Sequence, residues 1–402
     1  MTWPLSTSNS LPYTTGVPTM TMGGPGVFAM EGSSTIADRS GNLLFFTDGR
    51  DIKRSDNTLA GVVQGLGHGP NSTQAALIVP AGCIVNAVGV GELKYFVFTT
   101  QDTYGRNPPT NVIPGLFVTP VSVVAAERPC AGECDRAYFN AQGVPTVTVG
   151  TTSKLASNVS EKLAATSIVG FPGQSGYWVV AHSFAVGSPT MSRQYLVYKV
   201  SNGTVSALAP QTIGTSHEAS GSGDFRRAIG QMKISPEGVV NTKIAVAVYQ
   251  GFVEILGFNR ATGLLSGPPR TYTRSAYGSV IRNDAWYGLE FSPTGNSVYA
   301  TTENASITPP NGQLLRFSTT GPSIVSSVSV STQLSGYDYS QLQLGPDGKI
   351  YIARPPINTT FTTGGSVGVL NAPDAIVPGF VPSIWTPTTS GVQLGLPNII
   401  IR

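Results

Sequence analysis

Charged residues are scarce in this sequence. Of its 402 residues, 24 are Lys or Arg and 21 are Asp or Glu, a share of 11% against about 25% in ordinary soluble domains. The basic residues form no run, and the densest group, Arg50, Lys53 and Arg54, is interrupted by Asp51. Nucleic-acid binding needs clustered Lys and Arg that neutralise phosphates, and an anionic membrane surface attracts the same clusters. We therefore expect neither nucleic acid nor a membrane surface as the main partner.

Long apolar runs are also lacking. The longest uncharged stretch, 75–91, contains Pro80, Asn86 and several glycines, and its β-branched content is typical of two buried strands rather than one membrane-spanning helix. The first eight residues have neither the basic segment nor the apolar segment of a signal peptide. We expect no membrane insertion and no cleavable signal peptide in this chain.

Cysteine is too rare for a disulfide framework, with only Cys83, Cys130 and Cys134. Cys130 and Cys134 lie four positions apart in a loop-like segment, where a local disulfide is one interpretation. A zinc site there is not expected, because no His or further Cys lies nearby in the sequence. These three residues leave the redox compartment open, and no cofactor is expected.

Helical patterns are almost absent, and one short helix is expected over 157–165. Short runs rich in β-branched and aromatic residues predict strands throughout: 42–47, 94–99, 177–182, 194–200 and 243–249. Gly and Pro number 47 and 30, and most of the runs are bounded by Gly, Pro, Asn or Asp. The chain is therefore predicted to be all-β.

A turn motif repeats along the chain. Ser235-Pro-Glu-Gly238, Ser292-Pro-Thr-Gly295 and Gly345-Pro-Asp-Gly348 each precede a strand pattern, and Asp38-Arg-Ser-Gly41 is a looser version. Pro presets φ at the second position of a tight turn and Gly supplies the positive φ at its end. The turn glycines are spaced by 57 and 53 residues, and a period of about 55 is typical of a β-propeller blade.

This period predicts one propeller of about seven blades of antiparallel strands over 25–402, with a closing strand from the tail 391–401. A pair of β-sandwich domains is the structural alternative. Residues 1–24 carry no charge and are rich in Ser, Thr, Pro and Gly. They are predicted to form an extended N-terminal arm that wraps the ring or docks on a partner.

With these motifs the sequence resembles the N-terminal, propeller-like region of large Bacteroidetes surface proteins that carry PKD domains and gliding-motility or type IX sorting domains. The resemblance covers most of the chain in consistent order, through 36–49, 72–80, 161–163, 177–182, 228–238, 287–295, 342–353, 368–374 and Gly395-Leu-Pro-Asn398. It implies a propeller with a role in surface display or adhesion. It implies no enzyme, and it carries over no catalytic residue.

Two features depart from that family. Its secreted members begin with a signal peptide and continue into PKD and sorting domains, and neither is in this sequence. A free-standing propeller without an export signal fits a virion component, which folds in the host cytoplasm and works outside after lysis. We expect an extracellular or virion-surface protein: a phage appendage, fibre or decoration protein, or a bacterial adhesin. Its arm would contact other virion or surface proteins.

Residues suited to catalysis form no pattern. Of the three histidines, His182 ends a strand pattern and is expected to be hydrogen-bonded there, whereas His217 lies in a Ser/Gly-rich loop and is expected to be solvated; no Ser-His-Asp pairing is apparent for them or for His68. Many acids occupy turn positions, where Asp bonds its own backbone. Asp48, Asp51 and Asp56 do not follow the calcium-loop spacing. Glu290 lies in a repeat strand, where it could be a candidate functional acid or equally an orienting structural acid at the propeller channel.

Aromatic residues are the remaining candidates for ligand contact. Trp286, Tyr287, Tyr337 and Tyr339, together with Trp385, could stack on a sugar, although packing between blades is the simpler interpretation. The leading hypothesis is thus a non-enzymatic recognition or structural module that binds a glycan or receptor. The alternative is a glycan hydrolase or lyase with an active site on one face of the propeller, which needs acids or histidines converging at the channel.

Overall fold

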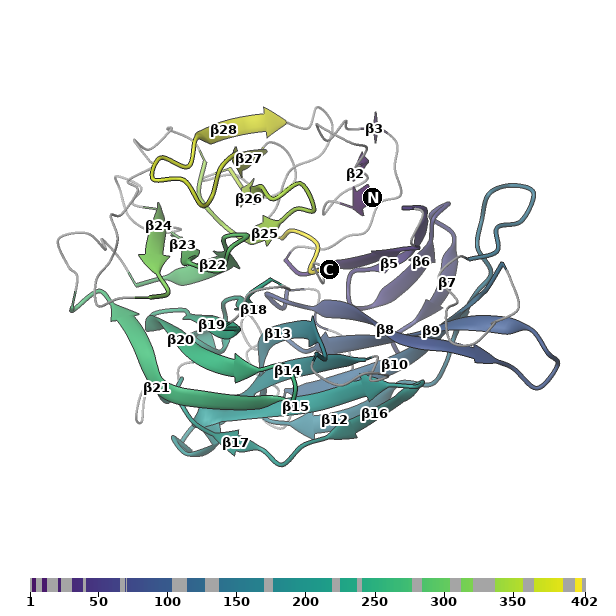
Figure 1. The fold of residues 1–402 in the computed structure, drawn as a ribbon, viewed down its shortest axis with the longest axis horizontal. Helices are drawn as coiled ribbons and strands as arrows, with labels where there is room; N and C mark the ends of the chain where they lie inside the picture. Colours follow the sequence, from purple (N-terminus) through teal and green to yellow (C-terminus); the bar gives the residue numbers. More distant parts are fainter. Residues whose placement is uncertain are drawn as a thin grey trace.

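A computed structural model shows an all-β molecule (Figure 1). Among the described residues the only helical segments are two 3₁₀ turns, Met191–Arg193 and Phe225–Ala228. The structure describes residues 2–4, 9–12, 21–22, 31–38, 41–65, 69, 71–102, 114–126, 137–169, 176–218, 225–236, 241–276, 284–303, 312–320, 337–356, 365–385 and 395–399.

Six antiparallel sheets follow one another around a central axis, and together they form a β-propeller (Figure 1). Blade 1 contains β4 (Ser34–Ala37), β5 (Leu43–Thr47), β6 (Asp51–Arg54) and β7 (Leu59–Val62). Blade 2 contains β8 (Ala76–Val85), β9 (Gly91–Thr100), β10 (Gly115–Val124), β11 (Val147–Val149) and β12 (Ser153–Ser157). Blade 3 contains β13 (Val159–Ser167), β14 (Tyr177–Ser183), β15 (Gln194–Ser201), β16 (Thr204–Ala207) and β17 (Gln211–Thr212).

The second half of the ring repeats this up-and-down order. Blade 4 contains β18 (Met232–Ile234), β19 (Lys243–Val248), β20 (Phe252–Asn259) and β21 (Leu264–Thr273). Blade 5 contains β22 (Trp286–Phe291), β23 (Ser297–Thr302) and β24 (Gln313–Ser318). Blade 6 contains β25 (Leu342–Leu344), β26 (Ile350–Arg354), β27 (Ser366–Leu370) and β28 (Phe380–Trp385). The first strand of each blade lies nearest the axis and is called its inner strand.

The propeller prediction is confirmed, but the predicted number of about seven blades is wrong, because the described residues form six. The 55-residue period holds only in the last part of the ring, where inner strands begin at Met232, Trp286 and Leu342. Blade 2 is much longer, since its inner strand begins at Ala76 and the next one begins at Val159. Dividing the chain length by the period therefore overcounts.

Apolar side chains fill the spaces between successive blades. One cluster joins blades 1 and 2 through residues such as Phe45 and Val97, and another joins blades 3 and 4 through Trp178 and Ile244. Three further clusters lie between blades 2 and 3, 4 and 5, and 5 and 6. Blades 2 to 5 are thus covered by apolar side chains on both faces, which explains the nearly continuous apolar patterns of their central strands.

The prediction of a short helix over 157–165 is wrong. Ser157 ends β12, Asn158 turns the chain with φ 58°, and β13 begins at Val159. Residues 159–164 are all buried, because an inner strand has neighbours on every side. Tertiary burial overrides the weak local helix preference here.

The repeated motif is the first hairpin of a blade. Between β22 and β23, the Gly295 N–H donates to the Ser292 carbonyl at 2.8 Å, and Gly295 has φ 67°. Between β25 and β26, the Gly348 N–H donates to the Gly345 carbonyl at 3.0 Å, and Gly348 has φ 75°. The tight-turn prediction is confirmed at both positions.

Residues 395–399 close the ring from inside. Pro397 forms a parallel bridge with Ser33, next to β4. The Asn398 N–H donates to the Ser33 carbonyl at 2.7 Å, and the Ser34 hydroxyl donates to the Asn398 carbonyl at 2.6 Å. The tail therefore contributes to closure as predicted, but its described part does so through one bridge beside an inner strand.

Outside the blades, β1 (Thr2–Pro4), β2 (Asn9–Pro12) and β3 (Thr21–Met22) form a small antiparallel sheet, with β1 close to β4. The division into an arm, 1–24, and a propeller, 25–402, stays a prediction. Among the described residues, no helix has the length and apolar character that a membrane crossing requires.

Cys83, on β8, is disulfide-bonded. Since the chain has only three cysteines, a bridge to Cys83 is incompatible with the local Cys130–Cys134 pair considered above. Cys130 and Cys134 themselves lie outside the described residues.

Candidate functional site

Glutamines connect the inner strands across the axis. Gln74, Gln231 and Gln341 each stand one or two residues before an inner strand, in blades 2, 4 and 6. Their side-chain oxygens accept hydrogen bonds of 2.8–3.0 Å from backbone N–H groups near the axis: Leu163 and Met232 for Gln74, Leu289 and Leu342 for Gln231, and Leu396 for Gln341. The glutamines of blades 2, 4 and 6 thus bond the backbone of the segments that follow them: blades 3 and 4, blades 5 and 6, and the C-terminal tail. This end of the channel, where the inner strands begin, is polar and tightly bonded.

Carboxyl groups gather at the same end. We call it the carboxylate end, and it contains Glu31, Asp102, Glu161, Glu303 and Asp338, which interact electrostatically with one another. Glu31 precedes β4, Glu161 lies within β13, Asp102 stands two residues after the end of β9, and Glu303 directly follows β23. Starts of inner strands and ends of second strands meet at one end of a propeller, and this brings the acids together from several blades.

Tyr287 lies among these acids. Its hydroxyl donates to Glu31 Oε2 at 2.7 Å, which ties the segment before blade 1 to blade 5. Thr73 donates its backbone N–H and its hydroxyl to Glu161 Oε2, both at 2.9 Å. Among the described residues Glu303 Oε1 has no hydrogen-bond partner. Two of the acids are therefore connectors between blades.

Burial changes the proton affinity of this end. Burial, assisted by the charge of Glu161, raises the pKa of Glu31 well above its usual value, although the Tyr287 hydroxyl opposes the shift. Burial and the nearby Asp338 raise the pKa of Glu303 in the same direction. Carboxyl groups with raised pKa values are the kind that serve as general acids near neutral pH.

No group of three or more His, Cys, Asp or Glu side chains in the described part of the chain is arranged to hold a metal ion. Asp48 instead accepts from the backbone N–H groups of Arg50 and Asp51, at 2.9 and 2.8 Å, and Asp56 accepts from Thr58. Asp48 and Asp56 therefore stabilise local turns.

Two histidines lie stacked in the interior between blades 3 and 4. The rings of His182 and His217 are 3.5 Å apart at their centroids and nearly parallel, at 12°. Tyr195 and Phe252 contact their outer faces edge-on. Both histidines are fully buried, and their ring nitrogens have no side-chain or backbone partner of good hydrogen-bond geometry among the described residues. The prediction that His217 is solvated is therefore wrong. His182 is hydrogen-bonded as a strand residue, since its carbonyl accepts the Ser160 hydroxyl at 2.9 Å; His68 lies outside the described residues.

The buried Lys162 lies close to the histidines. Its Nζ donates to the carbonyl oxygens of Ala228 and Ile229 at 2.7 and 2.6 Å. Burial lowers the pKa of Lys162 to about 7, against the opposing effect of Glu161. Burial also lowers the pKa of His182 to about 3 and that of His217 well below its usual value. The histidine pair is therefore neutral at physiological pH.

The aromatic residues considered as ligand contacts are mostly interior. Trp286, Tyr287 and Tyr339 are buried, and Tyr337 is half-buried. The guanidinium of Arg354 lies 5.2 Å from the Tyr337 ring and 5.5 Å from the Tyr339 ring. Nothing is described for the side chain of Trp385. Whether any of these residues contacts a ligand stays a prediction.

The contacts of Glu290 fit the structural one of its two interpretations. Its Oε2 lies 3.2 Å from Lys233 Nζ and accepts the Leu344 N–H at 2.9 Å, so it joins blades 4, 5 and 6. Glu290 and Lys233 line a small cavity of about 30 Å³, with room for about two water molecules.

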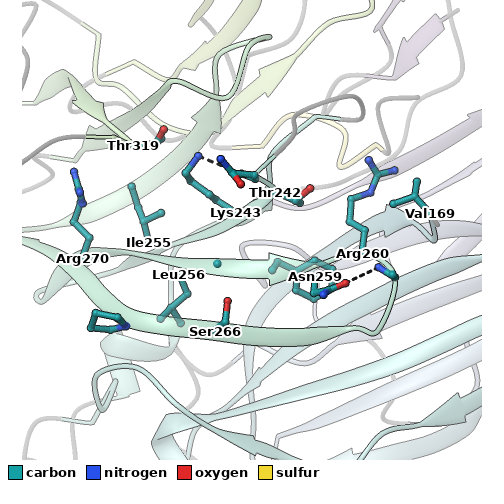
Figure 2. Close-up of a pocket in the computed structure, with 15 residues that line it drawn as sticks. Val169, Thr242, Lys243, Ile255, Leu256, Asn259, Arg260, Ser266, Arg270 and Thr319 are labelled. Carbon is teal, nitrogen blue, oxygen red and sulfur yellow. Dashed lines mark hydrogen bonds between the residues drawn. The ribbon is translucent and has the colours of Figure 1, made fainter.

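A far larger cavity, of about 760 Å³, lies on blade 4 (Figure 2). We call it the blade 4 groove. It forms where the pairing of β20 with β21 shifts between Ile255 and Gly257, and it extends to Val169 of blade 3 and Thr319 of blade 5. Among the described residues fifteen line the groove, and they include Lys243, Arg260 and Arg270 but no Asp or Glu.

Sequence patterns missed the carboxylate end and the groove, because both join residues from distant segments. For the carboxylate end, one sequence feature could have indicated its position: a glutamine recurs just before the inner strands of blades 2, 4 and 6. For the groove, the only indication in the sequence was the presence of Lys243, Arg260 and Arg270 within one segment.

No protein-family model matches this chain, and no curated protein matches it. Solved structures resemble it distantly. One is a Bacteroides uniformis protein assigned provisionally as a 6-phosphogluconolactonase, with 9% identity and a TM-score of 0.36 over 91% of this chain and 98% of that one. Trypanosoma rangeli sialidase has 10% identity and a TM-score of 0.35, over 89% of this chain and 57% of the sialidase chain. Porphyromonas gingivalis dipeptidyl peptidase 4 has 9% identity and a TM-score of 0.29, over 90% of this chain and 55% of the peptidase chain. Similarities this low carry no argument about function.

Proposed function

We propose that this propeller is a non-enzymatic recognition module, displayed on a virus particle or a cell surface, that binds its ligand at the blade 4 groove. The observation that carries the proposal is the groove itself. Its volume of about 760 Å³ lies in the range of small-molecule and oligosaccharide sites. Its lining combines cations with amides and hydroxyls, a set suited to binding rather than to acid–base chemistry.

The polar groups near the axis support a structural role for the channel. Gln231 and Glu290 use their side-chain oxygens to hold backbone N–H groups of other blades. Residues 395–398 are buried inside the ring. A channel filled in this way makes a rigid frame, and a rigid frame suits recognition on its outer surface.

Two further observations favour a surface location. Cys83 is disulfide-bonded, and disulfides persist mainly in oxidising, extracytoplasmic environments. The sequence resemblance to displayed Bacteroidetes propellers points the same way. The small N-terminal sheet is the proposed contact to other virion or surface proteins. Deleting residues 2–24 should abolish incorporation into the particle or multimer while leaving the propeller folded; retained incorporation would exclude the arm as the tether.

The main test is a glycan array followed by product analysis. The purified chain should bind a restricted set of saccharides, and mass spectrometry should find those saccharides unchanged after long incubation. Cleavage of any bound saccharide would overturn the non-enzymatic proposal.

The second candidate is a glycan hydrolase whose active site is the carboxylate end. It is favoured by the 2.7 Å hydrogen bond between Tyr287 and Glu31, together with the raised pKa of Glu31, which would supply a proton donor. In that case Glu31→Gln and Tyr287→Phe would each abolish turnover of a fluorogenic glycoside panel, whereas Lys243→Met in the groove would leave turnover intact.

A further inference from the structure

We infer that the blade 4 groove selects an acidic saccharide, one that carries a carboxylate or sulfate group, and that Lys243 and Arg270 bind this group. The inference rests on the proposed function and adds the chemical class of the ligand.

The cationic side chains lie along one side of the groove. Figure 2 shows Lys243, Arg260 and Arg270 pointing to the same side of β20, from three different segments of blade 4. Lys243 and Arg270 are half-buried, whereas Arg260 is nearly fully buried. No carboxylate is among the described lining residues. Three positive charges around one cavity create a local potential that attracts an anion.

Arg260 has a different role from Lys243 and Arg270. Its Nε donates to the Ser167 carbonyl at 3.0 Å, and its guanidinium also bonds the Ser167 hydroxyl. Its carbonyl oxygen accepts the indole N–H of Trp178 at 2.8 Å. Arg260 is thus held by blade 3 and contributes charge, while Lys243 and Arg270 remain at the accessible part of the groove.

The positive charge of Lys243 lies in unfavourable surroundings. Its Nζ donates to the backbone carbonyl of Asn241 at 3.2 Å. Burial and the neighbouring positive charge of Arg270 lower the pKa of Lys243. An anion placed between the two would offset this repulsion and raise that pKa again, so anion binding should be accompanied by proton uptake.

The rest of the lining favours a polyhydroxylated ligand. Asn241, Asn259 and Ser266 are exposed and offer amide and hydroxyl groups, and Thr242 offers another hydroxyl (Figure 2). The one aromatic lining residue, Phe258, is buried, so the described groove has no ring on which a nucleobase could stack. Hydroxyl and amide partners around a cationic pair match a sugar acid or a sugar sulfate.

Isothermal titration calorimetry tests this with matched probes. One pair is an oligogalacturonate and its fully methyl-esterified form, and the other is a sulfated dextran oligosaccharide and its unsulfated parent. We expect at least one charged form to bind at least tenfold more tightly than its neutral counterpart. Which of them does so distinguishes carboxylate from sulfate recognition. Neutral forms that bind equally well would overturn the inference, as would inorganic phosphate or a phosphoserine peptide binding as tightly as the saccharides.

Variants locate the site. Lys243→Met and Arg270→Gln should each weaken binding at least tenfold, whereas Lys349→Met and the exposed Arg50→Gln, which remove the same charges elsewhere, should change it less than twofold. Equal losses in both sets would reveal unspecific attraction and contradict the inference. Proton uptake, measured at alkaline pH in buffers of different ionisation enthalpy, should disappear in Lys243→Met. Binding that survives both groove variants would refute this inference alone, whereas cleavage of the saccharide would refute the proposed function.

Discussion

The side-chain oxygen of Gln231 accepts a hydrogen bond of 3.0 Å from the backbone N–H of Leu342, 111 residues further along the chain. It also accepts the N–H of Leu289 at 2.9 Å. One amide group therefore fastens blade 4 to both blade 5 and blade 6, at a point where water cannot replace it.

Gln231→Met should expose the importance of this connection. The change keeps the side-chain volume but leaves two buried N–H groups without an acceptor, each costing about 1–3 kcal/mol. We expect the free energy of unfolding, measured with urea, to fall by about 2–4 kcal/mol. Gln142→Met, at an exposed turn, is the matched control and should change stability by less than about 0.5 kcal/mol. Equal effects would show that the interblade bonds contribute little.

The stacked histidines should make the protein sensitive to acid. Because the pKa of His182 is lowered to about 3 in the folded chain, the unfolded chain takes up the proton first, near pH 6.5. The stability contribution is complete above pH 6.5 and is lost as the pH falls toward 3, by about 1.4 kcal/mol per pH unit for one such histidine.

His182→Phe removes this titration while keeping an aromatic ring in the stack. We expect its stability to depend less steeply on pH between 6.5 and 4 than that of the parent chain, as measured by urea unfolding at several pH values. Parallel pH profiles for the two proteins would contradict the assignment of acid sensitivity to this pair.

The Lys233–Glu290 pair is buried, with side chains only 7% and 5% exposed. Glu290→Met leaves the Lys233 charge in the interior with Gln343 Oε1 as its hydrogen-bond partner, and breaking such a pair costs about 3–5 kcal/mol. The double variant Lys233→Met/Glu290→Met should be more stable than Glu290→Met alone, because no buried charge remains. Strictly additive losses in a denaturation cycle would argue against the pair.

The Cys83 bridge can be mapped by its partners. Reduction with dithiothreitol should destabilise the parent chain by about 2–5 kcal/mol, and Cys83→Ala should show the same loss without further change on reduction. Of Cys130→Ala and Cys134→Ala, only one should behave like Cys83→Ala. If neither does, the bridge does not form within one molecule in solution.

Patterns in the sequence were sufficient for the fold class and for much of the repeat. Alternating and continuous apolar runs located β5, β9, β14, β15 and β19, and Gly295 and Gly348 marked the hairpins, because strands and tight turns depend on neighbouring residues. The number of blades depended instead on the length of the connections. The short helix failed where burial of 159–164 against other blades outweighed local propensity.

The candidate sites were less accessible to sequence analysis. Glu290 could be placed because it lies inside a repeat unit. Glu31 and Tyr287, 256 residues apart, become neighbours only when the ring closes, and the same is true of His182 and His217, which no local pattern pairs. The sequence also could not show that Lys243 and Arg270 share a groove, since that depends on the shifted register of β20 and β21.

The closure beside Ser33 also sets an order for folding. Ser34 and Asn398, bonded at 2.6 Å, are separated by 364 residues, so blade 1 emerges from the ribosome long before its partner exists. Synthesis at about 5–20 residues per second leaves the first blade waiting for tens of seconds with one edge unfinished. Blades 2 to 6 can assemble on one another as they emerge, but completion of the ring is a late step that follows translation of residue 398.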